Sequence, residues 1–335
     1  MNSSRTNAKS VTAVAGLTAA AALILPTLPA SASPQAHTDS IRYVSVKSCE
    51  IHGSTLPCGP WRLEMHSGKE YELTDARTQP LDASGKPVKD LTAPISVSGN
   101  GRDVAYFRKS DNRLVVRELG GAVHVMSEDA LPEKIGMDSV SLQLSLDGRR
   151  LAVQYNDENG HEPSRVYEVA KGRAPAKIPG RYDVRNFSRD GSTVLVVDYT
   201  DDNTSRLLTY DSDGGELSRI DPPQVVANNA PYGLSTDRKT IAFFTGIAPK
   251  LSLRLYDTSA DMIVQSTKVR PGGTDSPEAV DWTGDDEITV HISHTDKAGR
   301  TTMRILLIDP ETGAVKVRDS YTVKSDAYFY AACGA

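Results

Sequence analysis

A polar turn followed at once by an apolar, β-branched run recurs four times along this chain of 335 residues, with a fifth, degraded copy. The leading Ser or Thr residues of successive copies are 47, 43, 47 and 48 positions apart. A period near 45 residues made of short strands is typical of the blades of a β-propeller. The copies occupy residues 98–105, 145–152, 188–195, 235–242 and 283–289.

Each repeat predicts four antiparallel strands and no convincing helix. A short strand precedes the Ser, and an Asp-Gly or Asn-Gly step can supply the positive φ angles of a tight hairpin. The strand after the turn is apolar along nearly its whole length, which indicates burial on both faces, as when one blade packs on the next. A third strand ends in Asp, as at Asp211 and Asp309, and a more polar fourth strand forms the outer edge.

The chain is therefore predicted to be all-β, a single propeller domain over residues 33–335, with six four-stranded blades favoured and seven as the alternative. The first blade, at about 41–92, shows only three clear strands. We expect the isolated β-favouring run at 327–331 to supply the missing fourth strand and close the ring. The other blades are predicted at about 93–139, 140–182, 183–229, 230–277 and 278–323.

The tandem pattern Ser-x-Asp-Gly-Arg-x-Leu-Ala, followed by Leu-Tyr-Asp, resembles the TolB-like, WD-repeat-like β-propeller proteins. The resemblance covers about residues 93–323, and 41–92 more weakly. The Trp that often precedes the Ser in that family stands only at Trp282, and no copy has Pro after the Ser. The resemblance implies the fold. Members of the family mostly bind proteins or sugars or form the non-catalytic half of a peptidase, but a fold does not transfer a function.

The first 32 residues have the three parts of a secretory signal peptide. Arg5 and Lys9 form a basic leader, an Ala-rich apolar run follows, and Ala30-Ser31-Ala32 matches a cleavage site. The style of this leader is similar to that of exported proteins of high-GC actinobacteria. A membrane anchor is the competing interpretation, but Pro26 comes too early for a span of about 20 residues. We expect a secreted, extracellular protein without a membrane span, cleaved after Ala32.

The charge balance argues against a nucleic-acid partner. The formal net charge is −5 for the whole chain, and removal of the leader takes away two further positive charges. Binding to a phosphate backbone requires a basic face, which an acidic chain does not readily supply. We expect a monomer that does not bind nucleic acid.

Three cysteines, Cys49, Cys58 and Cys333, leave one unpaired in a monomer. In an exported chain the two near neighbours favour a disulfide between Cys49 and Cys58, across a segment able to turn back on itself. The sequence by itself leaves the other two pairings, both with Cys333, open. A zinc site is poorly supported because no second Cys pair or nearby His pair exists.

No catalytic or cofactor motif occurs in the sequence. The chain lacks a G-x-S-x-G elbow, a P-loop and a G-x-G-x-x-G fingerprint. His291 and His294 are three apart, so in a strand they point to opposite faces and do not share a metal. Carboxylates at 198–203 offer a low-ranked calcium possibility, more simply explained as a solvated loop. We therefore expect no catalytic residues, no bound metal and no cofactor.

In a propeller, the connections between second and third strands share one face with the connections between blades. We call this the loop face. It is predicted to be acidic and to carry the amphipathic aromatics Tyr182, Tyr199 and Tyr232, a residue type favoured at interfaces. We expect a non-catalytic binder of a protein or glycan on this face. Its predicted ligand-binding residues are Asp183, Asp201, Asp202, Asn229, Tyr232 and Glu278.

Two other functions remain compatible with the sequence. The first is a secreted enzyme, a lyase or a lactonase-like hydrolase, with carboxylates or a metal at the central channel. The second is a scaffold associated with the cell envelope. Wet loops are polar in any protein, so the acidic character of the loop face does not by itself select the binder.

Overall fold

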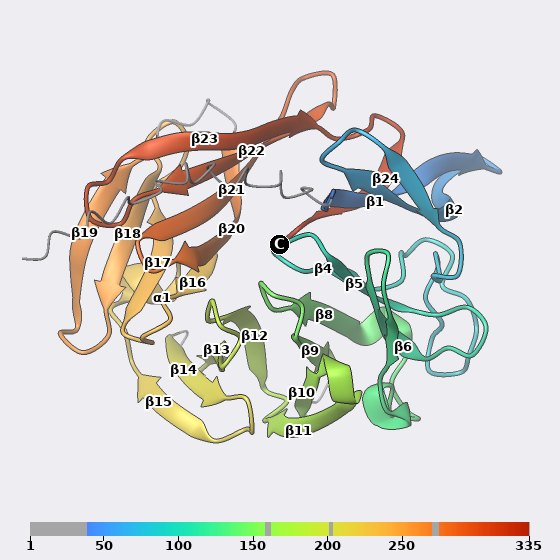
Figure 1. The fold of residues 1–335 in the computed structure, drawn as a ribbon, viewed down its shortest axis with the longest axis horizontal. Helices are drawn as coiled ribbons and strands as arrows, with labels where there is room; N and C mark the ends of the chain where they lie inside the picture. Colours follow the sequence, from blue (N-terminus) through green and yellow to red (C-terminus); the bar gives the residue numbers. More distant parts are fainter. Residues whose placement is uncertain (1–38, 158–161, 201–203, 270–274, 335) are drawn as a thin grey trace, which may run out of the picture. The chain divides into compact units, whose positions relative to one another are not determined.

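The computed structural model describes residues 39–157, 162–200, 204–269 and 275–334 (Figure 1). The predicted signal peptide, Asp201 and Asp202 lie outside these residues. Within them, 24 strands form six four-stranded antiparallel sheets arranged as a ring, which confirms the six-bladed propeller. No helix in this part of the chain is long and apolar enough to cross a membrane.

Each blade runs from an innermost strand at the centre of the ring to an outermost strand on its rim. Blade 1 contains β24 (Ala327–Ala332), β1 (Ile41–Ile51), β2 (Ser54–Met65) and β3 (Glu70–Leu73). Blade 2 contains β4 (Ile95–Val97), β5 (Asp103–Phe107), β6 (Leu114–Glu118) and β7 (Val123–Val125). Blade 3 contains β8 (Val140–Leu144), β9 (Arg150–Tyr155), β10 (Ser164–Glu168) and β11 (Arg173–Ile178).

The second half of the ring repeats this order. Blade 4 contains β12 (Tyr182–Phe187), β13 (Thr193–Tyr199), β14 (Ser205–Asp211) and β15 (Glu216–Ile220). Blade 5 contains β16 (Tyr232–Leu234), β17 (Thr240–Thr245), β18 (Ser252–Asp257) and β19 (Met262–Lys268). Blade 6 contains β20 (Asp275–Gly284), β21 (Glu287–Thr295), β22 (Thr301–Ile308) and β23 (Val315–Thr322). The described helices are short: α1 (Gln224–Ala227), η1 (Glu128–Ala130), η2 (Met137–Ser139) and η3 (Val169–Lys171).

The repeated sequence motif is a hydrogen-bond circuit that shapes the turn between the first two strands of a blade. In blade 3 the Ser145 hydroxyl donates to Asp147 Oδ1 at 2.8 Å and accepts from the Arg150 amide at 3.0 Å. Asp147 Oδ1 also accepts from the Arg149 amide at 3.0 Å. Blades 2, 4 and 5 form the same circuit from Ser98, Ser188 and Ser235. The spacing of Ser and Asp is therefore fixed by the turn itself.

The turn also explains the glycine that follows the acidic or amide residue. Gly148 has φ +74°, and a Cβ at this position would lie 2.1 Å from Asp103 Oδ2 of the preceding blade. Blade 5 has Arg238 at the equivalent position, with φ 65°. A left-handed residue with a side chain is strained, so this copy keeps the turn at a local cost in free energy.

The apolar core is divided among the seams between blades. Six clusters of buried residues lie one at each seam, and the second and third strands of the blades supply most of them. This arrangement confirms the prediction that apolar strands are buried on both faces. The seam between blades 6 and 1 has the smallest cluster, made of Tyr43, Met303, Ile305, Tyr321, Val323 and Ala332.

The C-terminal strand closes the ring, as predicted. β24 pairs antiparallel with β1 from Tyr43↔Ala332 to Lys47↔Ala327, so blade 1 is built from both ends of the described chain. The sequence left its position in the blade open. The structure makes it the innermost strand, beside β4, with the C-terminus near the centre of the ring (Figure 1).

Removal of the closing strand is expected to destabilise the whole ring. Truncation before Ser325 exposes the edge of β1 and removes Ala332 from the smallest inter-blade cluster. We expect the melting temperature to fall by more than about 10 °C, or cooperative melting to be lost. Differential scanning calorimetry measures this. Tyr328→Phe, which removes only the hydrogen bond to the Asp90 carbonyl, is the control and should change little. Equal melting temperatures of the truncated and full chains would contradict the role of β24 in closing the ring.

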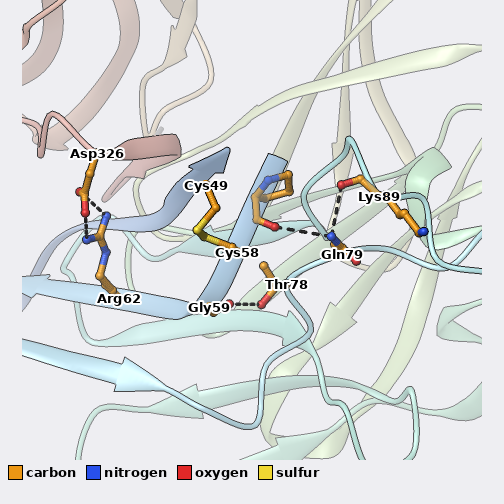
Figure 2. The surroundings of a disulfide bond; sticks show 9 residues. Cys49, Cys58, Gly59, Arg62, Thr78, Gln79, Lys89 and Asp326 are labelled. Atoms are coloured by element: carbon orange, nitrogen blue, oxygen red, sulfur yellow. Dashed lines mark hydrogen bonds and ion pairs between the residues drawn. A yellow bond between two sulfur atoms is a disulfide. The ribbon is translucent and has the colours of Figure 1, made fainter. Parts of the chain in front are cut away.

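The Cys49–Cys58 disulfide is present, and Cys333 is a free thiol. The segment between the two cysteines turns back on itself, as expected, but most of it is strand. It is the outer half of the long β1–β2 hairpin, in which Cys49 pairs with Leu56 and Lys47 with Cys58. Figure 2 shows the hairpin held against the connection that leads to blade 2. The Thr78 hydroxyl donates to the Gly59 carbonyl at 2.5 Å, and Gln79 Nε2 donates to the Pro57 carbonyl at 3.5 Å.

This arrangement predicts one slowly reacting thiol per chain. Burial raises the pKa of Cys333 to about 11, so little thiolate is present at pH 8. Thiol titration should therefore be slow in the native protein and should give one equivalent in non-reducing denaturant. Peptide mapping without reduction should recover a Cys49–Cys58 pair. A linkage from Cys333 to either of these cysteines would contradict the assignment.

Candidate functional site

The two faces of the ring differ in chemistry. The loop face carries the connections between blades and between second and third strands. The opposite face, which we call the turn face, carries the Ser-Asp turns and the hairpins between third and fourth strands. A hollow of about 590 Å³ lies on the turn face, whereas the sequence placed the predicted ligand on the loop face.

Asp183 lies on the loop face at the start of the innermost strand of blade 4, in a polar cluster. Its Oδ1 accepts from Gln154 Nε2 and its Oδ2 from Arg185 Nη2, both at 2.8 Å. Arg185 Nη2 also donates to the hydroxyl of Tyr199 at 2.5 Å, and the guanidinium lies 5.8 Å from the Tyr199 ring centre. Asp183 is therefore neutralised by Arg185, while Tyr199, 57% exposed, remains available to a partner.

Two of the predicted aromatic contacts are corrected by the structure. Tyr232 is 3% exposed, and its hydroxyl lies 2.9 Å from the Val226 carbonyl and 2.6 Å from the Ala227 carbonyl. Burial raises the pKa of Tyr232 to about 12. Tyr182 is 1% exposed. Both side chains belong to seams between blades because the first residue of an innermost strand already faces the neighbouring sheet.

The remaining predicted ligand residues are dispersed. Asn229 is half-buried, and its Nδ2 donates to the Val225 carbonyl at 2.9 Å, which completes the end of α1. Glu278 is exposed on β20, and its Oε1 accepts from the Ser293 hydroxyl at 2.5 Å. Asp201 and Asp202 lie outside the described residues. No hydrogen bond described in the structure joins Asp183, Asn229 and Glu278 into one site.

The first carboxylate of the possible calcium site, Asp198, lies close to two arginines. Asp198 is 6% exposed, with Arg206 Nη1 at 3.7 Å and Arg181 Nε at 3.9 Å from its oxygens. Across the described ranges, no group of three or more His, Cys, Asp or Glu residues is arranged to hold a metal ion. His291 is buried, and His294 Nδ1 lies 3.0 Å from Asp275 Oδ1.

Sequence analysis missed the exposed apolar side chains of the loop face. Phe329 in the closing strand is 42% exposed and lines a hollow of about 260 Å³ with residues 92–95 and 137–142. Ile247, in the connection between β17 and β18, is 84% exposed. The other large exposed apolar residues of this face are Ile51, Leu91, Tyr199 and Val225. The sequence signal that could have indicated an exposed Ile247 is an isolated Ile between turn residues.

The remaining large exposed apolar side chains are found on the outermost strands. They are Tyr71, Val125, Leu217, Met262, Val264, Val315 and Val317. Among the described residues, none lies in a connection of the turn face. The apolar contact surface of this ring is therefore confined to the loop face and the outer rim.

The turn-face cavity lies between blades 2 and 3 and has a volume of about 590 Å³. Charged groups dominate its lining. The titratable residues around it are Arg102, Asp103, Glu118, His124, Asp147, Arg149, Arg150, Glu168 and Asp190. Glu118 Oε1 lies 2.7 Å from His124 Nε2, and this contact holds the pKa of Glu118 below its usual range.

Asp103 lies at the base of the turn-face cavity and is 9% exposed. Burial, followed by the nearby carboxylate of Glu118, raises the pKa of Asp103 to about 6. Because this exceeds the value near 3.9 expected for an unfolded chain, the native state binds the proton more tightly. The stability that this adds is complete below about pH 4 and disappears as the pH rises through about 6.

Asp103→Asn should therefore stabilise the protein at neutral pH. The variant lacks the buried charge, so we expect its free energy of unfolding at pH 7.5 to rise by about 1 kcal/mol, a value reduced for solvent in the cavity. The difference from the natural chain should shrink towards pH 4. Chemical denaturation at several pH values measures both. Asp286→Asn removes an exposed carboxylate from the same face and should leave the profile unchanged. A variant that is less stable than the natural chain at pH 7.5 would contradict the claim that the buried charge of Asp103 is destabilising.

Hydrogen bonds between innermost strands cross the central channel. Asn186 Nδ2 of blade 4 lies 2.8 Å from the Tyr232 carbonyl, 2.9 Å from the Val280 carbonyl and 3.0 Å from Asp281 Oδ1. The Gly334 amide donates to the Val97 carbonyl at 3.2 Å. The hollows next to these groups are about 50 and 20 Å³, far below the 300–1,000 Å³ usual for small-molecule sites.

Comparison with known proteins finds only distant structural likenesses. No protein-family model matches the chain, and no curated protein matches it. A putative TolB from Agrobacterium tumefaciens is 13% identical over 84% of this chain and 88% of its own, with a TM-score of 0.44. The β-propeller domain of the Trilobed protease from Pyrococcus furiosus is 11% identical over 82% and 79%, with a TM-score of 0.46. The Myceliophteria thermophila Cps50 (Swd1) β-propeller domain is 14% identical over 68% and 70%, with a TM-score of 0.41.

Proposed function

We propose that this protein is an exported, non-catalytic recognition module that binds a polypeptide partner with its loop face. The observation that carries the proposal is the presence of exposed large apolar side chains on that face, with Phe329 beside a hollow of about 260 Å³. Large aromatic and aliphatic side chains are the usual anchors of protein interfaces, and connections on a rigid scaffold are the usual place for them.

The charge of the loop face supports a partner with a cationic patch. Glu278 is exposed, and Asp201 and Asp202 add two negative charges to the connection that follows Tyr199. Such charges increase the rate of encounter and weaken with salt, while the apolar anchors supply the affinity. Since Asp183 is already neutralised by Arg185, we assign it to holding Arg185 against Tyr199.

Export is supported by two independent features. The leader of residues 1–32 has the order of parts found in secretory signal peptides. The Cys49–Cys58 bridge lies in an outer hairpin, where an oxidising compartment would preserve it. Attachment to the cell envelope has no comparable support within the described residues.

The narrow channel disfavours the alternative of an enzyme with a central site. A sugar or lactone needs several times the volume of the two hollows near Asn186 and Gly334. Asp281, the carboxylate best placed in the channel, accepts a hydrogen bond from Asn186, and burial raises its pKa to about 6. We interpret Asn186 and Asp281 as cross-links between blades 4 and 6.

Photo-crosslinking tests the loop face directly. A benzoylphenylalanine at position 247 or 199 should capture the same polypeptide from the culture of the source organism. The same group at position 286, on the turn face, should capture none. Ile247→Ser should reduce capture at least tenfold without altering the melting curve, because it removes a contact that is 84% exposed.

The matched control is Met262→Ser, which removes an exposed apolar side chain from an outermost strand and should leave capture unchanged. Capture from position 286 alone would overturn the assignment to the loop face. Binding of a glycan that is weakened by Ile247→Ser would support the loop face as the binding site but would show that the ligand is a glycan and not a polypeptide. Turnover of a sugar or lactone by the purified protein would overturn the non-catalytic assignment.

A further inference from the structure

We propose that the turn-face cavity is a second binding site, and that it takes an alkylammonium group such as the end of a lysine side chain or of an alkyl diamine. The site is independent of the loop-face function because it lies on the opposite face of the ring. Its volume of about 590 Å³ is within the range of small-molecule sites.

The charges that line the cavity favour a cation. Three arginines and His124 face five carboxylates, so the carboxylates outnumber the cations even when His124 is protonated. Two of the arginines are engaged within the wall, Arg149 with Asp147 at 3.5 Å and Arg150 with Glu168 at 4.0 Å. A negative excess therefore remains around Asp103, Glu118 and Asp190, which are contributed by different blades or strands.

The Asp103 carboxylate has one long side-chain hydrogen bond in the described structure. It lies 3.4 Å from the Ser98 hydroxyl, which is the only side-chain donor placed on it among the described residues. That hydroxyl has a single proton, and Asn100 Oδ1 at 2.7 Å accepts it in the turn circuit. A carboxylate that is nine-tenths buried and poorly hydrogen-bonded is costly. An ammonium group in the cavity would supply the missing donor and the opposite charge.

The repeat itself marks Asp103 as exceptional. Five residues after the leading Ser, blades 3, 4 and 5 have Arg150, Thr193 and Thr240. Blade 2 alone of these four has a carboxylate at this position, and it places Asp103 against Gly148, the one residue type that leaves room for it. The turn does not require the carboxylate, because the backbone amide of residue 103 makes the contact with Ser98.

Binding should depend on pH because Asp103 loses its proton near pH 6. The groups that face it are Arg102 on its own turn, Glu118 across the hairpin and Asp147 from blade 3. Arg102 favours the ionised form of Asp103, whereas Glu118 and Asp147 oppose it. Above about pH 6 Asp103 is ionised and adds its negative charge to the attraction for a cation. At pH 5 Asp103 is protonated and the attraction is weaker.

Calorimetric titration of the full folded chain with 1,5-diaminopentane, and separately with N-acetyl-lysine methylamide, tests the proposal. At pH 7.5 and low salt we expect saturable binding of one molecule per chain, at least fivefold weaker at pH 5.0. Asp103→Asn should weaken binding at least tenfold, and Asp286→Asn, an exposed carboxylate on the same face, should leave it unchanged. If Asp103→Asn fails to fold, Glu118→Gln replaces it with the same expectation.

Three results would overturn the proposal. The first is equal binding by Asp103→Asn and the natural chain. The second is equal weakening by Asp286→Asn, which would mean general attraction to an acidic surface. The third is stoichiometric calcium binding that excludes the diamine, which would make the cavity a metal site. Each result leaves the loop-face proposal intact, because Ile247→Ser and capture from position 247 test that face separately.

Discussion

Pairing between the two ends of the described chain is the constraint on which the whole ring depends. Five blades are continuous stretches of sequence, but blade 1 exists only when β24 joins β1. Without that pairing, β1 would present an open edge and the innermost strands would lose one of their six members. The seam that this pairing completes has the fewest buried residues of the six. The ion pair of Arg42 with Asp319 at 2.9 Å and the stacked rings of Tyr43 and Tyr321 support it.

Further ion pairs hold the approach to the closing strand. Arg62 pairs with Asp326 at 3.0 Å, just before β24 begins, and Figure 2 shows this contact beside the disulfide hairpin. Lys324 lies 3.3 Å from Glu64 and also pairs with Glu70. Exposed ion pairs contribute little individually, but here they join strands far apart in sequence, so they add specificity to the closure.

The fold gives its two faces different physical characters. On the turn face, the hydrogen bonds of the Ser-Asp circuit pair the polar groups of each turn, so the connections are short and rigid. The cavity between blades 2 and 3 is the place where this regular pattern includes an extra carboxylate. On the loop face, no repeated circuit restrains the described connections, and exposed side chains such as Ile247 and Phe329 can meet a partner.

The sequence by itself determined the class of fold and the period of the blades, because both depend on local pattern, and it favoured the disulfide and the closing strand that the structure contains. A Ser that caps its own turn and an apolar strand beside it are visible without neighbours. It also indicated which connections share a face. It could not determine which residues of that face are exposed: Tyr232 appeared as a surface aromatic from its position beside a connection, yet tertiary packing buries it in a seam.

The tertiary structure alone decided how distant residues meet. Asp103 looked like an ordinary turn residue, and its raised pKa arises only because Glu118 and the Gly148 turn of the next blade enclose it. The length of the β1–β2 hairpin was hidden because Pro57 and Gly59 resemble a loop, whereas β2 continues through them and only His52 and Gly53 form the turn. The burial and the electrostatic environment of a residue depend on contacts from several blades. The sequence of one repeat does not show which residues of the other blades make those contacts.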